Sequence, residues 1–325
     1  MMSTIVLAFL LSGTRCCSAS EPTKNEINLQ DWERQVAIAE LLTKSIGESF
    51  GIVATTLTIL TYLIFPTLRT TFGQNLISLS FSILISNTLE LLSNVIVING
   101  ACKIIEIFLY WSSLSQTLWS TMIMIDLMMA FRSKDKKLRQ NKYRFCIYSC
   151  IVWTMSTMTT TALILLAVFL PGILEDVKSR HCWIGSFYGQ LVAYVLPISL
   201  FALLNIVLFC LVRSMAYYAS VVSNARRTLL QKTKRRSAIA RPMDDTCKAM
   251  MNIVIVLGLT EVFGLIKIGR TTEAAIIVNA VFNYIYVFFH SFRGLLIFVC
   301  LTSTRRIAKL YRERFLLNKT NDCLE

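Results

Sequence analysis

The chain has 325 residues, of which 55% are hydrophobic and only 16% are charged, and its mean hydropathy is +0.59. This apolar content excludes an ordinary soluble globular protein and predicts that lipid is the solvent. The surplus of 33 Lys and Arg over 19 Asp and Glu is confined to short segments between long apolar runs. It therefore indicates membrane topology, and not a nucleic-acid partner.

Residues 1–19 are predicted to be a signal peptide. A short apolar stretch over 5–11 precedes small residues that end at Ala19, and seven apolar residues are too few to span a bilayer. The absence of a basic residue before this stretch and the position of Arg15 after it argue against cleavage. Residues 20–45 then form a short polar segment, which we expect to be extracellular.

Seven runs of mostly apolar residues follow, each long enough to cross a hydrocarbon core of roughly 30 Å as a helix. Pro66 ends the first run, and the pairs Asn99-Gly100 and Pro171-Gly172 follow the second and the fourth. The predicted fold is an all-α integral membrane protein, with a seven-transmembrane helix bundle over 46–301. The runs lie at 46–66, 74–98, 104–131, 145–170, 187–213, 247–268 and 274–301.

The positions of the basic residues predict the orientation of the bundle. The loops and the tail on one side hold 23 Lys and Arg, whereas the opposite side holds eight. Because positive charge stays in the cytoplasm, the N-terminus is expected outside and residues 302–325 inside. In that tail Ile307, Leu310, Tyr311 and Phe315 share one face, which predicts a C-terminal amphipathic helix on the inner leaflet of the lipid bilayer.

Two cysteines and three aromatic residues mark the outer side. Cys102 stands at the outer end of the third run and Cys182 in the second outer loop, so we expect a disulfide bond between them in an oxidising compartment. Trp183 adjoins Cys182 and is the first candidate for a ligand contact. Tyr194 and Trp111 are further candidates, although such aromatic residues more often serve as packing anchors.

Polar side chains inside the runs are costly in lipid, and they predict a polar switch network that faces the bundle interior. Asp126 and Arg293 are hypothesised to form an inactive-state lock near the cytoplasmic face; in the alternative, each reaches its own partner or water. Pro197 removes a backbone hydrogen bond from the fifth run and predicts a hinge. The network is expected to comprise Glu90, Asp126, Asn205, Glu261, His290 and Arg293.

The basic loops are expected to face a transducer protein, with topology charge as the alternative reading. The residues concerned are Arg132, Lys136, Lys137, Arg226, Arg227, Arg235 and Arg236. The sequence carries no P-loop and no hydrolase or metalloprotease motif. Its two histidines, His181 and His290, are too few and too separated for a metal site. No enzymatic activity, cofactor or metal is therefore expected.

Several short motifs occur in an order and at spacings that resemble the Methuselah-like receptors, a branch of the secretin-like and adhesion-like G-protein-coupled receptors. The resemblance covers roughly residues 45–310. It implies a plasma-membrane receptor that couples an extracellular ligand, with a peptide as one candidate, to a heterotrimeric G protein. The motifs are Leu68-Arg69, Gly73, Trp119, Asp126, Phe131-Arg132-Ser133, Arg144-Phe145, Trp153, Pro171-Gly172, Cys182-Trp183, Pro197, Asn205, Gly258-Leu259-Thr260 and Gly294.

The departures from that family lie in the expected switch network. Glu261 stands where the family has Trp, and His290 and Arg293 replace Asn and Gln. A short segment also stands in place of the large cysteine-rich ectodomain of Methuselah itself. These differences keep open a truncated or decoy receptor that folds without signalling. A seven-helix chemoreceptor channel or a transporter is the other alternative, and the distribution of basic residues opposes the channel.

Overall fold

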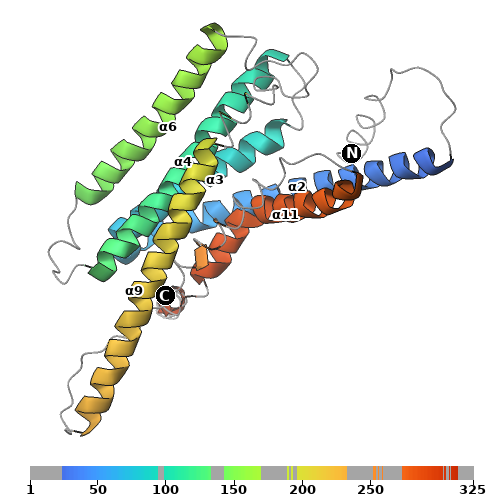
Figure 1. The fold of residues 1–325 in the computed structure, drawn as a ribbon. Helices are drawn as coiled ribbons and strands as arrows, with labels where there is room; N and C mark the ends of the chain where they lie inside the picture. The colour runs from blue at the N-terminus through green and yellow to red at the C-terminus, as the bar shows by residue number, and fades with distance from the viewer. Residues whose placement is uncertain are drawn as a thin grey trace, which may run out of the picture. The chain divides into compact units, whose positions relative to one another are not determined.

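The computed structural model of the chain is helical throughout the part that it describes, in which no strand occurs (Figure 1). The chain divides into two compact units, Met1–Leu41 and Leu42–Glu325. Of the first unit, the described residues are those from Lys24 onward, which begin the first helix, and the packing and the site discussed below belong to the second unit. The described residues are 24–93, 99–132, 143–169, 196–232, 273–302 and 309–313, with single positions at 189, 192, 252, 253, 255, 258, 304 and 307.

The first helix, α2 (Lys24–Ile64), ends where the sequence predicts a breaker. Pro66 has no backbone N–H and disfavours a helical conformation in the residue before it. Phe65 is accordingly extended, with φ −105° and ψ 95°, and Pro66 opens a short 3-10 helix, η1 (Pro66–Leu68). Helix α2 starts well before residue 46, so the segment that precedes the first apolar run is helical from residue 24.

A tight turn joins α2 to the next helix. The Arg69 side chain donates a hydrogen bond of 3.2 Å from Nε to the Tyr62 carbonyl and a second from its guanidinium to the Leu63 carbonyl. It thereby satisfies backbone acceptors that the end of a helix leaves without partners. Gly73 packs directly against the Leu68 carbonyl, where a Cβ atom would have no room. The glycine is thus required by the close approach of two backbones.

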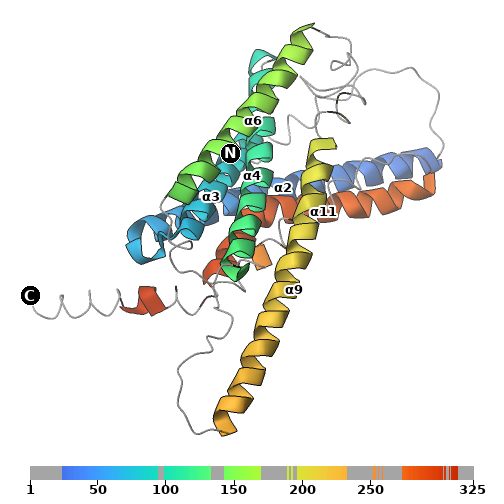
Figure 2. The ribbon, with the colours of Figure 1, turned by 60° about the vertical axis from the view of Figure 1, so that its left-hand side comes forward.

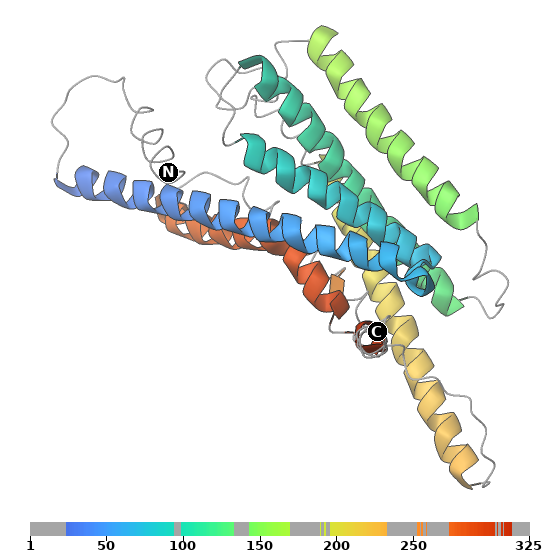
Figure 3. The same cartoon turned by 180° about the vertical axis from the view of Figure 1, so that it is seen from behind.

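Helix α4 is the common neighbour of three other helices, because it packs against α3, α6 and α9, while α3 also contacts α6 and α11. Figure 2 shows α4 between α3 and α9. Within the second unit, α11 runs along α2 (Figure 3). The bounds of these helices are α3 (Thr71–Ser93), α4 (Asn99–Arg132), α6 (Tyr143–Phe169), α9 (Leu196–Lys232) and α11 (Glu273–Thr302).

The observed helices agree with six of the seven predicted runs, and the run at 247–268 lies outside the described residues except at four positions. Helix α9 continues beyond residue 213, where the predicted run ends. The apolar composition marks only where the chain leaves the bilayer, and the helix goes on into the basic residues that follow. The spans long and apolar enough to cross a membrane are Arg34–Ile64, Thr71–Ser93, Tyr143–Phe169, Ser199–Tyr218 and Val281–Thr302.

Helix α4 is not among these spans because polar side chains occupy its middle. Its neighbours cover them, so that they are hidden from lipid and satisfied within the protein. This placement explains how the least apolar of the predicted runs takes the central position. The buried polar residues of α4 are Ser112, Ser115, Gln116, Thr117, Ser120 and Thr121.

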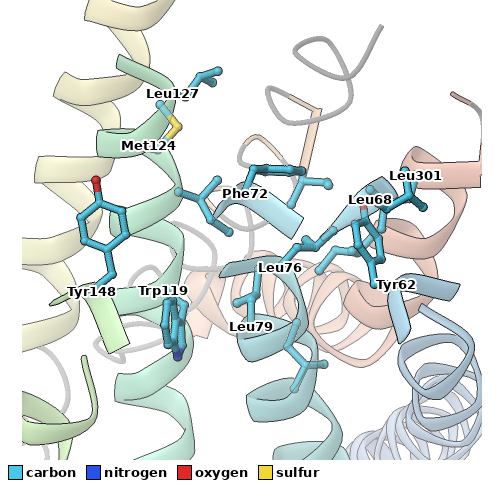
Figure 4. Packing of buried hydrophobic residues seen from close by; sticks show 14 of the residues in the cluster. Tyr62, Leu68, Phe72, Leu76, Leu79, Trp119, Met124, Leu127, Tyr148 and Leu301 are labelled. Carbon is cyan, nitrogen blue, oxygen red and sulfur yellow. The ribbon is translucent and has the colours of Figure 1, made fainter. Parts of the chain in front are cut away.

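The main apolar core joins α2, α3, α4, α6, α9 and α11 at the end of the bundle near the turn at Pro66 (Figure 4). Leu76 and Leu79 of α3 and Trp119 of α4 are fully buried there. A buried tryptophan removes about 150–250 Å² from solvent, so Trp119 is the largest single contribution to this core. The core fixes the register of α4, and with it the positions of the polar residues described below.

The start of the C-terminal tail packs against this same end of the bundle. Ile307 is buried, whereas Arg312 and Glu313 are exposed, as an amphipathic helix requires. The Tyr311 hydroxyl lies 2.6 Å from Thr61 Oγ1, and its ring meets that of Phe65 edge to face at 5.2 Å between centroids. Phe315, the fourth apolar residue of the predicted face, lies outside the described residues.

Candidate functional site

Small residues bring α2 and α11 into close backbone contact. A Cβ atom at Gly294 would stand 2.9 Å from the Gly51 carbonyl oxygen, and one at Gly47 would stand 2.6 Å from Ser291 Cβ. Glycines at such positions let transmembrane helices approach each other without intervening side chains. The close packing places the charged residues of α2 and α11 next to those of α3.

An ion-pair cluster forms where these three helices meet. The Lys44 ammonium lies 3.2 Å from Glu90 Oε2 and 3.6 Å from Glu48 Oε1. His290 Nδ1 lies 3.9 Å from Glu90 Oε1. Glu48 and Glu90 are buried, whereas the Lys44 side chain is 33% exposed. One partly exposed lysine therefore bridges two buried carboxylates.

Arg293 joins the same cluster through a serine. Its guanidinium donates a hydrogen bond of 3.0 Å to Ser86 Oγ, and the Ser86 hydroxyl donates one of 3.3 Å to Glu90 Oε1. Arg293 is also close enough to Glu90 for their charges to interact. We refer to Lys44, Glu48, Ser86, Glu90, His290 and Arg293 as the charge cluster. It ties α2, α3 and α11 together.

A second set of polar contacts joins α4 to its three neighbours. Gln116 Nε2 donates a 3.2 Å hydrogen bond to the Ser82 carbonyl of α3, and Ser115 donates one of 3.0 Å to Ser156 of α6. Asn205 of α9 donates a 3.0 Å hydrogen bond from Nδ2 to Ser120 Oγ. Asn205 thus forms an interhelical hydrogen bond.

Four aromatic rings line the interface between α4 and α6. Trp111 stacks on Trp153 at 5.2 Å between centroids, and Trp153 meets Trp119 edge to face at 5.9 Å. Trp119 also stacks with Phe145 at 6.1 Å. Trp111 donates a 3.3 Å hydrogen bond from Nε1 to Thr157 Oγ1. Trp111 thus packs against α6, and its part in binding a ligand stays a prediction.

The hypothesised lock partners lie in different clusters. Asp126 Oδ1 is 3.8 Å from the guanidinium of Arg144, at the start of α6, and the same guanidinium lies 2.8 Å from Met129 Sδ. Arg293 belongs to the charge cluster. Each of the two residues thus has its own partner, as in the alternative to the lock. The ion pair of Asp126 and Arg144 joins the ends of α4 and α6 that flank residues 133–142.

Most of the other predicted site residues lie outside the described part of the chain. Cys102 is disulfide-bonded, but its expected partner Cys182 is among them, and the pairing stays a prediction. Pro197 is the second residue of the described part of α9, and the predicted hinge stays a prediction. The residues that lie outside are Lys136, Lys137, Cys182, Trp183, Tyr194, Arg235, Arg236 and Glu261.

The expected transducer surface is described only in its helical backbone. Arg132 is the last residue of α4, and Arg226 and Arg227 lie in the extension of α9 beyond its apolar span. Lysine and arginine commonly lie at the ends of membrane helices, where their charged groups reach water, and these three residues lie at such ends. Their part in binding a transducer stays a prediction.

Sequence reasoning missed several members of the charge cluster. Glu48 lies inside the first apolar run and was not counted among its ionisable residues, and Lys44 was assigned to the outer loop charge. The spacing of four residues between Lys44 and Glu48 is the signal that would have found them, because i and i+4 share a helix face. Arg144 was likewise counted as loop charge, although it begins a helix and pairs with Asp126.

The arrangement is suited to holding helices together and to exchanging partners. It does not resemble a catalytic centre. In the described part of the chain, no three His, Cys, Asp or Glu side chains gather closely enough to hold a metal ion. Lys44 bridges two buried acids and is partly exposed, so it is the member of the cluster that can also reach water. Such a lysine can support two arrangements of the same helices.

The comparisons with known proteins point to one family. A family model described as 7 transmembrane receptor (Secretin family) matches residues 39–297, which span all the described helices after the first unit except the last residues of α11. No curated protein matches the chain.

Proposed function

Because the chain belongs to the secretin family of seven-transmembrane receptors, we propose that it is a plasma-membrane receptor that transmits an extracellular signal to a heterotrimeric G protein. The family match, which covers 39–297, carries this proposal. Within the family we place the chain with the Methuselah-like receptors, on the motifs from Leu68-Arg69 to Gly294. The basic residues, 23 on one side and eight on the other, support an extracellular N-terminus.

The proposed mechanism uses the two ends of the bundle. A ligand, with a peptide as one candidate class, binds between the outer helix ends and the loop that holds Cys182 and Trp183. Binding stabilises an alternative arrangement of helices already present in the ensemble. The charge cluster then exchanges partners, because Lys44 bridges Glu48 and Glu90 and is the most exposed of the cluster's charged members.

The inner end supplies the surface for the G protein. The ion pair of Asp126 and Arg144 brackets the basic residues of 133–142, and the long α9 carries Arg226 and Arg227 away from the apolar span. A basic surface of this kind attracts acidic surfaces of a partner through long-range electrostatics. Freeing the end of α4 from α6 changes the spacing of these basic residues.

The test is agonist-independent activation of a panel of G proteins in cells at matched surface expression. We compare the unmodified chain with a variant in which the basic residues of 232–241 are neutralised, and with a control in which Lys178 and Arg180 of the predicted outer side are neutralised. Activation that falls only in the first variant supports the proposal and identifies the G protein. If none of the three proteins activates a G protein although all reach the cell surface, and if adding a library of candidate ligands does not change this, the result would support a decoy receptor.

The orientation is tested separately. An epitope at the N-terminus of the mature chain should be accessible to antibody on intact cells, whereas one after Glu325 should be accessible only after permeabilisation. The Asn318-Lys319-Thr320 sequon supplies an internal check, because glycosyl transfer occurs only on the lumenal side. A glycan on Asn318 would show that the predicted topology is wrong and that the tail lies on the outer side.

A further inference from the structure

Glu48 is a buried carboxylate without a complete set of partners. Its side chain is 1% exposed, and neither carboxylate oxygen has a hydrogen-bond partner among the described residues. The Lys44 ammonium at 3.6 Å is an ion-pair contact beyond ordinary hydrogen-bond length. A buried carboxylate that accepts no hydrogen bond is costly and calls for a further donor or cation.

Two neutral side chains on the helices that pack against this part of α2 share this property. The amide atoms of Asn87 and the hydroxyl of Ser291 are buried and have no hydrogen-bond partner in the described part of the chain. Asn87 and the Ser291 carbonyl both face Gly51 on α2, and Ser291 also faces Gly47, the residue before Glu48. Carboxylate, amide and hydroxyl oxygens thus line one seam between α2, α3 and α11.

The charges around the two glutamates are distributed unequally. Glu90 is surrounded by His290, Arg293 and Lys44, whereas the charged groups that act on Glu48 are Lys44 and Glu90. Glu48 therefore depends on Lys44 for its positive charge and is repelled by Glu90. Removing the ammonium would leave Glu48 without a positive charge beside it, a role that one monovalent cation can take.

We propose that Glu48, with the amide oxygen of Asn87 and the hydroxyl of Ser291, binds a small monovalent cation in place of the Lys44 ammonium. Hard cations take oxygen ligands of these kinds. The cation is small because Glu48, Asn87 and Ser291 are at most 1% exposed, so the seam admits an ion only when Lys44 withdraws. The 33% exposed Lys44 side chain can withdraw toward water.

A small cation of this kind can be an inorganic ion or the protonated amino group of an organic ligand.

The experiment measures the melting temperature of the purified full-length receptor in detergent, at constant ionic strength. NaCl or methylammonium chloride replaces choline chloride, whose cation is too large for the seam. Na⁺ should raise the melting temperature saturably, by about 5 °C at full occupancy. A larger rise with methylammonium would assign the site to an organic amine.

Three variants make the test specific. Glu48→Gln should abolish the cation-dependent rise, and Lys44→Met should lower the half-saturating cation concentration about tenfold, because the competing ammonium is gone. Glu313→Gln is the matched control: Lys309 and Glu313 form another i, i+4 pair at 3.6 Å, but on the exposed surface. If Glu48→Gln does not fold, Asn87→Ala should weaken cation binding and serves instead.

An equal response to all the chloride salts would overturn the proposal, as would an unchanged half-saturation in Lys44→Met. A second outcome would also overturn it: in choline chloride Glu48→Gln melts higher than the unmodified chain, and Na⁺ does not change the melting temperature of the unmodified chain. In that case a proton on Glu48 satisfies the site, and the cation proposal is refuted. Because no G protein is present in the assay, these outcomes are independent of whether the receptor signals.

Discussion

The contact between Gly294 and Gly51 offers a sharp test of how α2 and α11 pack. In Gly294→Ala the new Cβ atom would lie 2.9 Å from the Gly51 carbonyl oxygen, 2.9 Å from Thr55 Cγ2 and 3.2 Å from Gly51 Cα. Two of these atoms belong to the backbone, so the helices must separate to admit the methyl group. Overpacking of this kind costs about 1–3 kcal/mol. The charge cluster lies on the same interface and would loosen with it.

Gly258→Ala is the matched control, because a Cβ atom at Gly258 meets no atom of the described residues within 4 Å. In a helix, alanine is favoured over glycine by roughly 0.5–1 kcal/mol, so this variant should melt slightly higher than the unmodified chain. Gly294→Ala should melt roughly 3–9 °C lower, as measured by tryptophan fluorescence on heating in detergent. A Gly294→Ala protein that melts at or above the unmodified chain would refute the close contact of α2 and α11.

Three further tests probe the interior of the bundle by the same thermal assay. Trp119→Phe keeps most of the aromatic contact and removes a buried N–H that lacks a partner in the described residues, so it should cost less than about 1.5 kcal/mol, whereas Trp119→Ala should cost about 3–5 kcal/mol. Asn205→Ala removes the hydrogen bond to Ser120 and should cost about 1 kcal/mol; no change in melting temperature would argue for a packing role alone. A double-mutant cycle of Asp126→Asn and Arg144→Gln should give a coupling energy of about 0.5–1 kcal/mol, and additive effects would contradict the ion pair.

The helices and their order were predictable because the bilayer imposes a length and an apolar composition on each span. Hydropathy located six described helices and placed Pro66 at the end of the first. It could not give the ends of α9, which continues as a helix to Lys232, or the start of α2 at Lys24. Both extensions are polar, and helical geometry continues where the lipid constraint stops.

The partners of the polar residues were not predictable in the same way. Asp126 and Arg293 were the acid and the base that seemed closest in depth, yet Asp126 pairs with Arg144 and Arg293 bonds to Ser86. Depth along a helix can be counted from the sequence, but the facing direction depends on how each helix is rotated. Glycines at 51 and 294 set that rotation for α2 and α11, and their role emerges only from the contact itself.

The polar contacts form a contiguous route through the bundle. The charge cluster ends at Ser86, and Ser82, one helical turn along α3, accepts the hydrogen bond of Gln116 on α4. Ser120, one turn further along α4, accepts that of Asn205 on α9. Contiguity alone does not transmit a signal, because coupling needs an element with two arrangements that both ends bias. If Lys44 withdraws as proposed above, it would be such an element, because it bridges two carboxylates at the start of this route.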